Sequence, residues 1–297
     1  VTGGILRCND DGSNLEIISR GFRNPWDIAF DNRFDWLGTD NDQTMGDKIF
    51  TPFFGSHFGW GHPWSYDWKG DDHLPTAPSS GPLFEGSGAG VIHCAIPGYP
   101  SNYNNVFFIN DWLNREIFIY RSRWDGAWRK PDRLKLEILA HAGGGRSMPL
   151  SKGRSFDPVD IEMGPDGAIW ITSWGRQYGA HYENNKLANE GRIYRVWPKD
   201  YSPSYPSRDT RTVEGLIGDL GSHLPAWRTN AQEELIRRGK SIEPFLRAAL
   251  RKPDLSVALE TWLVWTIGRI NPESWFEENT NRKIQSIRVA AFNGRLH

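Results

Sequence analysis

Short apolar runs separated by polar turns fill the first two thirds of the chain. Pro25-Trp-Asp-Ile and Pro158-Val-Asp-Ile open two of these runs, so the pattern repeats internally. Apolar segments at this spacing predict pairs of β-strands joined by tight turns. Such units, recurring with aromatic side chains between them, are typical of β-propeller blades. The predicted strand pairs are residues 25–30 with 36–39, 105–110 with 116–120, and 158–163 with 170–173.

The repeat also predicts how much of a propeller is present. A blade takes about 40–50 residues, so residues 1–198 make four or five. The sequence opens on Gly3-Gly-Ile-Leu-Arg7, which echoes Gly191-Arg-Ile-Tyr-Arg195 and belongs to the middle of a blade. An open propeller exposes sheet faces and strand edges, which favours aggregation. We therefore expect residues 1–198 to be the C-terminal part of a propeller with its first blades upstream. The repeats resemble those of six-bladed folds, which implies six blades in all.

Helical periodicity replaces the strand pattern after a segment rich in proline and serine. Residues 199–210 are predicted to be a linker, because proline lacks an amide donor and serine favours turns. Residues 211–297 then place apolar side chains at helical spacing, as at positions 213, 216, 217 and 220. The predicted fold is therefore mainly β followed by all-α, with residues 211–297 as an incomplete HEAT-like solenoid. Its helices are expected at residues 212–220, 227–238, 241–250, 255–270 and 284–292.

Composition narrows the classes of function. The net charge of −1 gives no basic field for nucleic acid, and no run of about 20 apolar residues predicts a transmembrane segment. The 15 Trp, 15 Phe and 9 Tyr fit large rings packed between sheets. Cys8 and Cys94 lack metal-ligand spacing and are either a disulfide pair, formed in an oxidising compartment, or buried thiols.

One polar stretch carries candidate chemistry. Arg23 offers a planar donor fork suited to carboxylates. Asp40, Asn41 and Asp42 place three oxygen-bearing side chains in succession, which suits a hard cation. The spacing differs from an EF-hand loop, and a polar turn that hydrogen-bonds its own backbone is the alternative interpretation.

Other candidates stand apart from this stretch. His181 lies in a long insertion before the last predicted strand, where loops often build sites, and it is the candidate base. His93 alternates with apolar residues, as expected of a core or channel-lining side chain. Trp60, Trp64 and Trp68 are either propeller packing or stacking surfaces for sugar rings.

Several motifs together resemble a known family. Gly21-Phe-Arg-Asn-Pro25, Gly46-Asp-Lys-Ile49 and Phe58-Gly-Trp60 look like the soluble sugar dehydrogenase and sorbosone dehydrogenase propellers that use pyrroloquinoline quinone (PQQ). Residues 156–170 and 191–196 resemble the last blade of that family. The resemblance implies that Arg23, Asn24 and Asn41 contact the quinone, and that Asp40, Asp42 and Gln43 contribute to a calcium site.

Propeller, linker and helical repeats together look most like the large membrane-bound dehydrogenase-like proteins of planctomycetes, which carry a c-type cytochrome segment. That likeness implies a periplasmic or extracellular location, a sugar or polysaccharide-derived substrate and a c-type cytochrome as electron acceptor.

The sequence also departs from the family pattern. The catalytic histidine of the family belongs to an early blade outside this sequence. Asp157 and Val159 stand where the family has quinone-gripping arginines, and a lysine is replaced within Asn110-Asp-Trp-Leu113. The leading hypothesis is a quinoprotein oxidoreductase acting on a sugar or alcohol. The alternatives are a non-catalytic carbohydrate-binding or scaffolding propeller and, third, a calcium-dependent propeller hydrolase.

Overall fold

The structure is a computed structural model that describes ten segments of the chain. These are residues 3–9, 11–41, 48–60, 76–82, 87–132, 136–142, 156–174, 182–187, 191–205 and 212–295.

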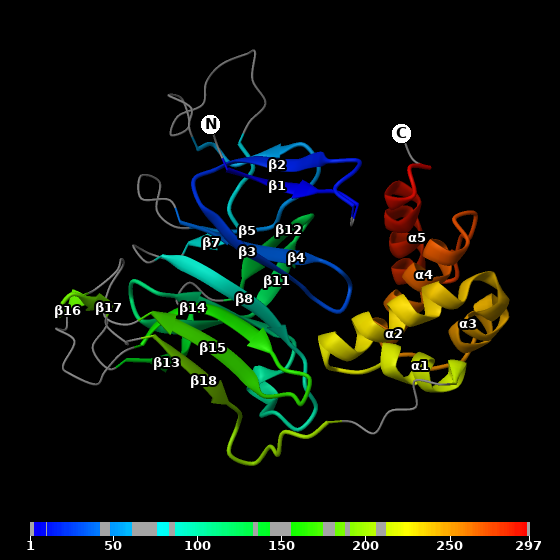
Figure 1. Cartoon of the computed structure of the whole chain (residues 1–297). Helices are drawn as coiled ribbons and strands as arrows, with labels where there is room; N and C mark the ends of the chain where they lie inside the picture. Colours follow the sequence, from blue (N-terminus) through cyan, green and yellow to red (C-terminus); the bar gives the residue numbers. More distant parts are fainter. Residues whose placement is uncertain are drawn as a thin grey trace, which may run out of the picture.

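Antiparallel sheets form the first part of the described chain (Figure 1). Three of them follow one plan: β3-β4-β5-β7, β8-β9-β10-β13 and β14-β15-β18. A smaller sheet, β1-β2-β6, pairs β2 with β6 in parallel, and two hairpins complete the set. The strands are β1 Gly3–Arg7, β2 Glu16–Phe22, β3 Pro25–Phe30, β4 Trp36–Asp40, β5 Lys48–Phe50, β6 Ser56–His57, β7 Gly81–Pro82, β8 Gly88–Cys94, β9 Val106–Asp111, β10 Glu116–Tyr120, β11 Ser122–Asp125, β12 Trp128–Pro131, β13 Glu137–His141, β14 Asp157–Met163, β15 Ile169–Trp174, β16 Tyr182–Glu183, β17 Lys186–Leu187 and β18 Arg192–Val196.

The three similar sheets stand side by side with their first strands in contact. Strand β8 packs against both β3 and β14. Gly90 allows this approach, because a Cβ there would lie 2.8 Å from the Cα of Asp160. In these three sheets the first strand begins, and the second strand ends, at the same edge. We call it the Arg23 edge: β3, β8 and β14 begin there, and β4, β9 and β15 end there. The opposite edge, where turns join these strand pairs, is called the turn edge.

Helices form the second part of the described chain, and several begin with a hydrogen-bonded cap. Thr212, Ser256 and Asn279 each accept a hydrogen bond from a backbone amide in the first turn of their helices. The bounds are α1 Val213–Leu220, α2 Pro225–Arg238, α3 Glu243–Leu250, α4 Val257–Ile270 and α5 Thr280–Phe292, with short 3-10 turns at Ser101–Tyr103 and Gly239–Ile242. Among the described residues, no helix combines the length and apolar character needed to cross a bilayer.

The helices lie at the turn edge of the sheets (Figure 1). Leu224 and Trp227 belong to the same buried cluster as Cys94 and Met163 of the sheets. The Trp227 indole nitrogen also donates to the carbonyl of Pro165 at 2.5 Å. The two parts of the chain therefore share a core, although α1 to α4 have a second core of their own.

The predicted order of a β-rich part followed by helices is confirmed. The predicted last helix starts too late: α5 begins at Thr280, because Asn279 caps a first turn of polar residues that carries no apolar stripe. Cys8 is exposed, Cys94 is buried, and both are free thiols. Six blades and HEAT-type stacking stay predictions, and no sheet in the described part closes on itself.

Candidate functional site

One hydrogen bond recurs at the Arg23 edge of all three sheets. The acceptor is a side chain on the last or next-to-last residue of the second strand. The donor is a backbone amide on the first residue of the first strand or on the residue just before it. We call this contact the edge brace. It joins Asn24 N to Asp40 Oδ1 at 2.8 Å, Ser87 N to Asp111 Oδ1 at 2.9 Å, and Asp157 N to Ser173 Oγ at 2.8 Å.

Asp40 makes the most extensive of the three braces. Its side chain is fully buried, and its two oxygens also accept from the amide of Arg23 at 3.2 and 3.3 Å. The Lys48 ammonium lies 3.6 Å away and balances the charge. Asp40 was predicted as a calcium ligand together with Asp42 and Gln43, which lie outside the described residues. Within the described ranges, no group of three acidic, histidine or cysteine side chains could hold a metal ion.

Arg23 lies between two amide side chains. Its Nη1 donates to Asn41 Oδ1 at 2.9 Å, and its guanidinium lies 5.7 Å from the centre of the Trp60 ring. With its amide turned so that both groups are satisfied, Asn24 accepts from Arg23 Nη1 at 2.9 Å. The structure thus brings together the three residues that the sequence predicted for quinone contact, beside an aromatic ring.

Polar contacts continue from this group along the edge. Asn41 Nδ2 donates to Ser87 Oγ, and the Ser87 amide is held by Asp111. Asp111 also accepts from the Asn114 backbone and side chain, each at 2.9 Å. Burial raises the pKa of the Asp111 carboxyl, and the hydrogen bonds from Asn114 and Ser87 oppose that rise.

An ion pair ends this line of contacts. Arg115 Nε donates to Asp157 Oδ1 at 3.0 Å, and both side chains are largely buried. Burial raises the pKa of the Asp157 carboxyl, while the Arg115 charge and hydrogen bond lower it. Asp157, one of the two positions where the resemblance implies an arginine, carries a carboxylate that binds Arg115. Val159, the other such position, is buried.

Three tryptophans from three sheets meet at the same edge, and the sequence pattern did not single them out. Trp26 packs edge-on against Trp174 at 6.4 Å between ring centres, and Trp112 against Trp174 at 5.3 Å. Trp26 remains 45% exposed. Trp112 and Trp174 each follow the brace residue of their sheet, as Asn41 follows Asp40. Aligning the strand pairs by register would have found them.

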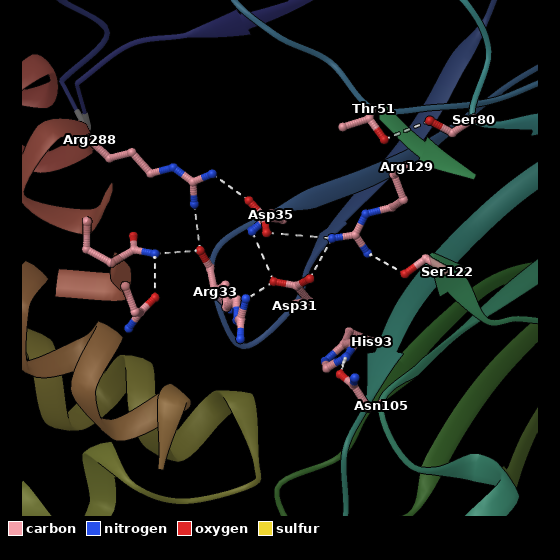
Figure 2. A network of polar contacts seen from close by, with 12 residues as sticks. Asp31, Arg33, Asp35, Thr51, Ser80, His93, Asn105, Ser122, Arg129 and Arg288 are labelled. Atoms are coloured by element: carbon pink, nitrogen blue, oxygen red, sulfur yellow. Dashed lines mark hydrogen bonds and ion pairs between the residues drawn. The ribbon is translucent and has the colours of Figure 1, made fainter. Parts of the chain in front are cut away.

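Three of the other predicted candidates, His181, Trp64 and Trp68, lie outside the described residues. His93 lies toward the turn edge, where its Nε2 is 3.0 Å from Asn105 Oδ1 (Figure 2). Burial lowers the pKa of His93 to about 4. His93 therefore lies at the edge opposite Arg23, as a neutral side chain in contact with Asn105.

The described part of the Arg23 edge carries three cationic side chains, each next to a polar or anionic partner. Arg23, Lys48 and Arg115 are each close to an amide or carboxylate, so the described part of the face carries no strong field of one sign. Arg23 with its two amides and Trp60 fits one carboxylate of a flat, anionic ligand. The exposed face of Trp26 fits an apolar ring surface such as the C–H face of a sugar. The residues at the Arg23 end therefore fit PQQ, whereas Asp157 adds no cationic contact.

Comparisons with known proteins give partial matches. No protein-family model matches the chain, and no curated protein matches it. A solved structure described as a putative oxidoreductase (glucose dehydrogenase) from Thermus thermophilus is similar at 14% identity and a TM-score of 0.43, over 61% of this chain and 47% of that one. The PQQ-bound aldose sugar dehydrogenase from Streptomyces coelicolor gives 15% identity and 0.43, over 65% and 51%. The apo soluble aldose sugar dehydrogenase from Escherichia coli gives 17% and 0.46, over 66% and 55%.

The chain spans about half the length of these solved structures. Similarity this low, over about half of each solved structure, does not establish a function for this chain. The function is therefore proposed from the residues of the site.

Proposed function

We propose that this chain is part of a sugar or alcohol oxidoreductase that uses PQQ, with its binding site at the Arg23 edge. The observation that carries the proposal is the arrangement of Arg23, whose guanidinium is held by Asn41 and Asn24 beside Trp60. A positioned guanidinium is suited to bind a carboxylate, and PQQ is a flat tricarboxylate.

Each neighbouring residue has a definable part in this proposal. Arg23 binds the anionic group, and Asn24 and Asn41 orient the guanidinium. Asp40 holds the amides of Arg23 and Asn24 and so fixes the backbone that carries them. Trp26 offers a surface for the sugar ring. When bound, the quinone supplies a two-electron acceptor for the oxidation.

Finer parts of the proposal rest on the sequence resemblance. They are calcium binding by the turn of residues 40–43, electron transfer to a c-type cytochrome, and a periplasmic or extracellular location. Because the Asp40 oxygens already accept two amides and face Lys48, calcium binding would depend on Asp42 and Gln43.

Titration of the full chain with PQQ tests the proposal, with absorbance and tryptophan fluorescence as readouts and with calcium present or chelated. We expect saturable binding that Arg23→Ala weakens at least about tenfold, the loss of one charge-assisted contact. Arg237→Ala is the matched control, since Arg237 is exposed on α2 and bonds to its neighbour Glu234. No binding at tens of micromolar, or equal binding by the Arg23→Ala variant, would overturn the proposal.

A carbohydrate-binding protein without redox activity is the second candidate. The cluster of Trp26, Trp112 and Trp174 favours it, as does the carboxylate at Asp157 in place of a cationic residue. Sugar titration without PQQ separates the two candidates. Fluorescence quenching that Trp26→Ala removes and Trp124→Ala retains, in a chain that binds no PQQ, would establish it. Trp124 is the control because it is similarly exposed, at 48%, on β11.

A further inference from the structure

The turn between β3 and β4, residues 31–35, is enclosed from two sides (Figure 2). Helices α2, α4 and α5 contact it on one side, and strand β12 contacts it on the other. This turn connects the two strands whose far ends carry Arg23, Asn24, Asp40 and Asn41.

Helix α5 binds the turn through two side chains. Arg288 donates to Asp35 Oδ1 at 2.5 Å and to the carbonyl of Arg33 at 2.6 Å. Gln285 donates to the same carbonyl at 2.9 Å. Gln285 is fully buried and accepts from the Trp265 indole at 3.0 Å, so its amide is fixed in orientation.

Helices α2 and α4 bind the tip of the turn. Arg228 donates to Asn32 Oδ1 at 3.0 Å, and burial lowers the pKa of its guanidinium to about 10. The ring of Phe34 packs edge-on against Trp262 and Trp265, with ring centres 5.0 and 5.5 Å apart. Both polar and apolar groups of the turn are therefore matched by the helices.

The backbone of the turn is itself shaped for this contact. Phe34 has φ of 56°, a left-handed conformation that a bulky aromatic residue rarely adopts. Such a conformation persists only where surrounding contacts hold it. The two tryptophans of α4 supply those contacts.

Strand β12 holds the turn from the opposite side. Arg129 is 1% exposed and donates to Asp31 Oδ2 at 2.6 Å and to Ser122 Oγ at 3.2 Å. Asp31 Oδ1 meanwhile accepts from the amides of Arg33 and Asp35. The turn is thus a rigid loop fixed at both faces.

The hairpin transmits this position to the Arg23 edge. Strand β3 has six residues, so it spans about 20 Å at the usual rise of a strand. Its pairing with β4 runs from Phe30 opposite Trp36 to Pro25 opposite Asp40. The ladder closes with the Asn41 amide donating to the carbonyl of Asn24 at 3.2 Å. A tilt of the turn would therefore shift both strand ends together.

We propose that Arg288 is a positioning residue for the Arg23 edge, acting through the β3–β4 hairpin. In this proposal the contacts of the helices with residues 31–35 determine the positions of Arg23, Asn24 and Asn41. The ligand-binding consequence rests on the proposed function, whereas the mechanical coupling stands without it.

Hydrogen exchange measured by mass spectrometry on the full chain tests the coupling. In Arg288→Ala, we expect amide exchange to become about fivefold faster or more in peptides covering residues 31–35 and also in peptides covering residues 22–25 and 39–41. Arg288→Lys, which keeps the charge and one donor, should recover part of the protection.

Arg295→Ala is the matched control. Arg295 has nearly the same exposed fraction as Arg288, 34% against 36%, and pairs with Glu273 inside the helical part. It should leave exchange in residues 22–41 unchanged. Faster exchange confined to residues 31–35, or equal effects of the two alanine variants, would overturn the proposal.

PQQ titration of the same variants gives a second readout. If wild type binds PQQ, Arg288→Ala should weaken binding by about threefold or more while Arg295→Ala does not, and equal affinities would overturn the positioning of the site. If wild type does not bind PQQ, the proposed function fails while the exchange result still decides the coupling.

Discussion

Replacing Asp40 by alanine distinguishes a structural brace from a metal ligand. The change removes the acceptor of the Arg23 and Asn24 amides and the carboxylate that lies 3.6 Å from the Lys48 ammonium. The equivalent changes in the other two sheets are Asp111→Ala and Ser173→Ala, which remove the braces to Ser87 and Asp157.

The contacts predict a graded loss of stability. Each buried amide left without an acceptor costs about 1–3 kcal/mol, and an ion pair broken in the interior costs about 3–5 kcal/mol. Asp40→Ala loses two amide contacts and the Lys48 pair, so we expect about 5 kcal/mol or more off the free energy of unfolding. Asp111 has no ion-pair partner among the described residues, so Asp111→Ala loses the Ser87 and Asn114 contacts and should cost about 2–3 kcal/mol. Ser173→Ala loses one amide contact and should cost about 1 kcal/mol.

Urea unfolding followed by tryptophan fluorescence measures these differences, with calcium present and with calcium chelated. A brace gives the order Asp40, Asp111, Ser173 in both conditions. If Asp40→Ala costs no more than Ser173→Ala, the reasoning from the braces is refuted. If its cost disappears on chelation, Asp40 acts as a calcium ligand and the predicted metal site is supported.

Three further predictions concern packing and charge. Gly90→Ala should lower stability in urea unfolding by about 1–3 kcal/mol, because the added Cβ would lie 2.8 Å from backbone atoms of β14. Gly191→Ala is the control and should be nearly neutral, because its Cβ would lie 3.7 Å from the nearest atom. Similar losses of stability for both variants would contradict the close approach of β8 and β14. Arg115→Ala removes the cation that pairs with the Asp157 carboxyl, whose pKa burial already raises. The loss of stability should therefore grow as pH rises above about 4, and adding Asp157→Asn should recover part of it at pH 7. A loss of stability that does not depend on pH would count against the ion pair. Burial lowers the pKa of His93 to about 4, so the unfolded chain binds its proton more tightly and stability should fall as pH drops from about 6.5 toward 4. His93→Gln should reduce that slope in unfolding measured across this range, and an unchanged slope would refute the assignment.

The repeat and the helix starts could be predicted from the sequence because both depend on local chemistry. Pro25-Trp-Asp-Ile and Pro158-Val-Asp-Ile mark β3 and β14, in which each aspartate accepts from the amide of the residue after it. Thr212, Ser256 and Asn279 precede helices that their side chains cap. A hairpin or a cap is settled by residues a few positions apart, so the pattern of side chains suffices.

The sheet β8-β9-β10-β13 contains a contact that the local sequence pattern does not predict. Gly90 of β8 occupies the position of Asp27 in β3, and the Val91 amide is bonded instead by Asp27 Oδ2 at 2.9 Å. This departure from the repeat is compensated by a neighbouring sheet, and the sequence of β8 alone does not reveal it.

The pattern of side chains along the chain was enough to predict that strands precede helices and that Arg23, Asn24 and Asn41 belong to one polar stretch of the candidate site. It did not predict that Asp40 braces two amides, that Trp26 meets Trp174, or that Arg288 binds Asp35 across 253 positions. These contacts could not be predicted because burial and pairing depend on which segments meet in space. Those contacts come from the packing of whole sheets and helices, which no local pattern of side chains specifies.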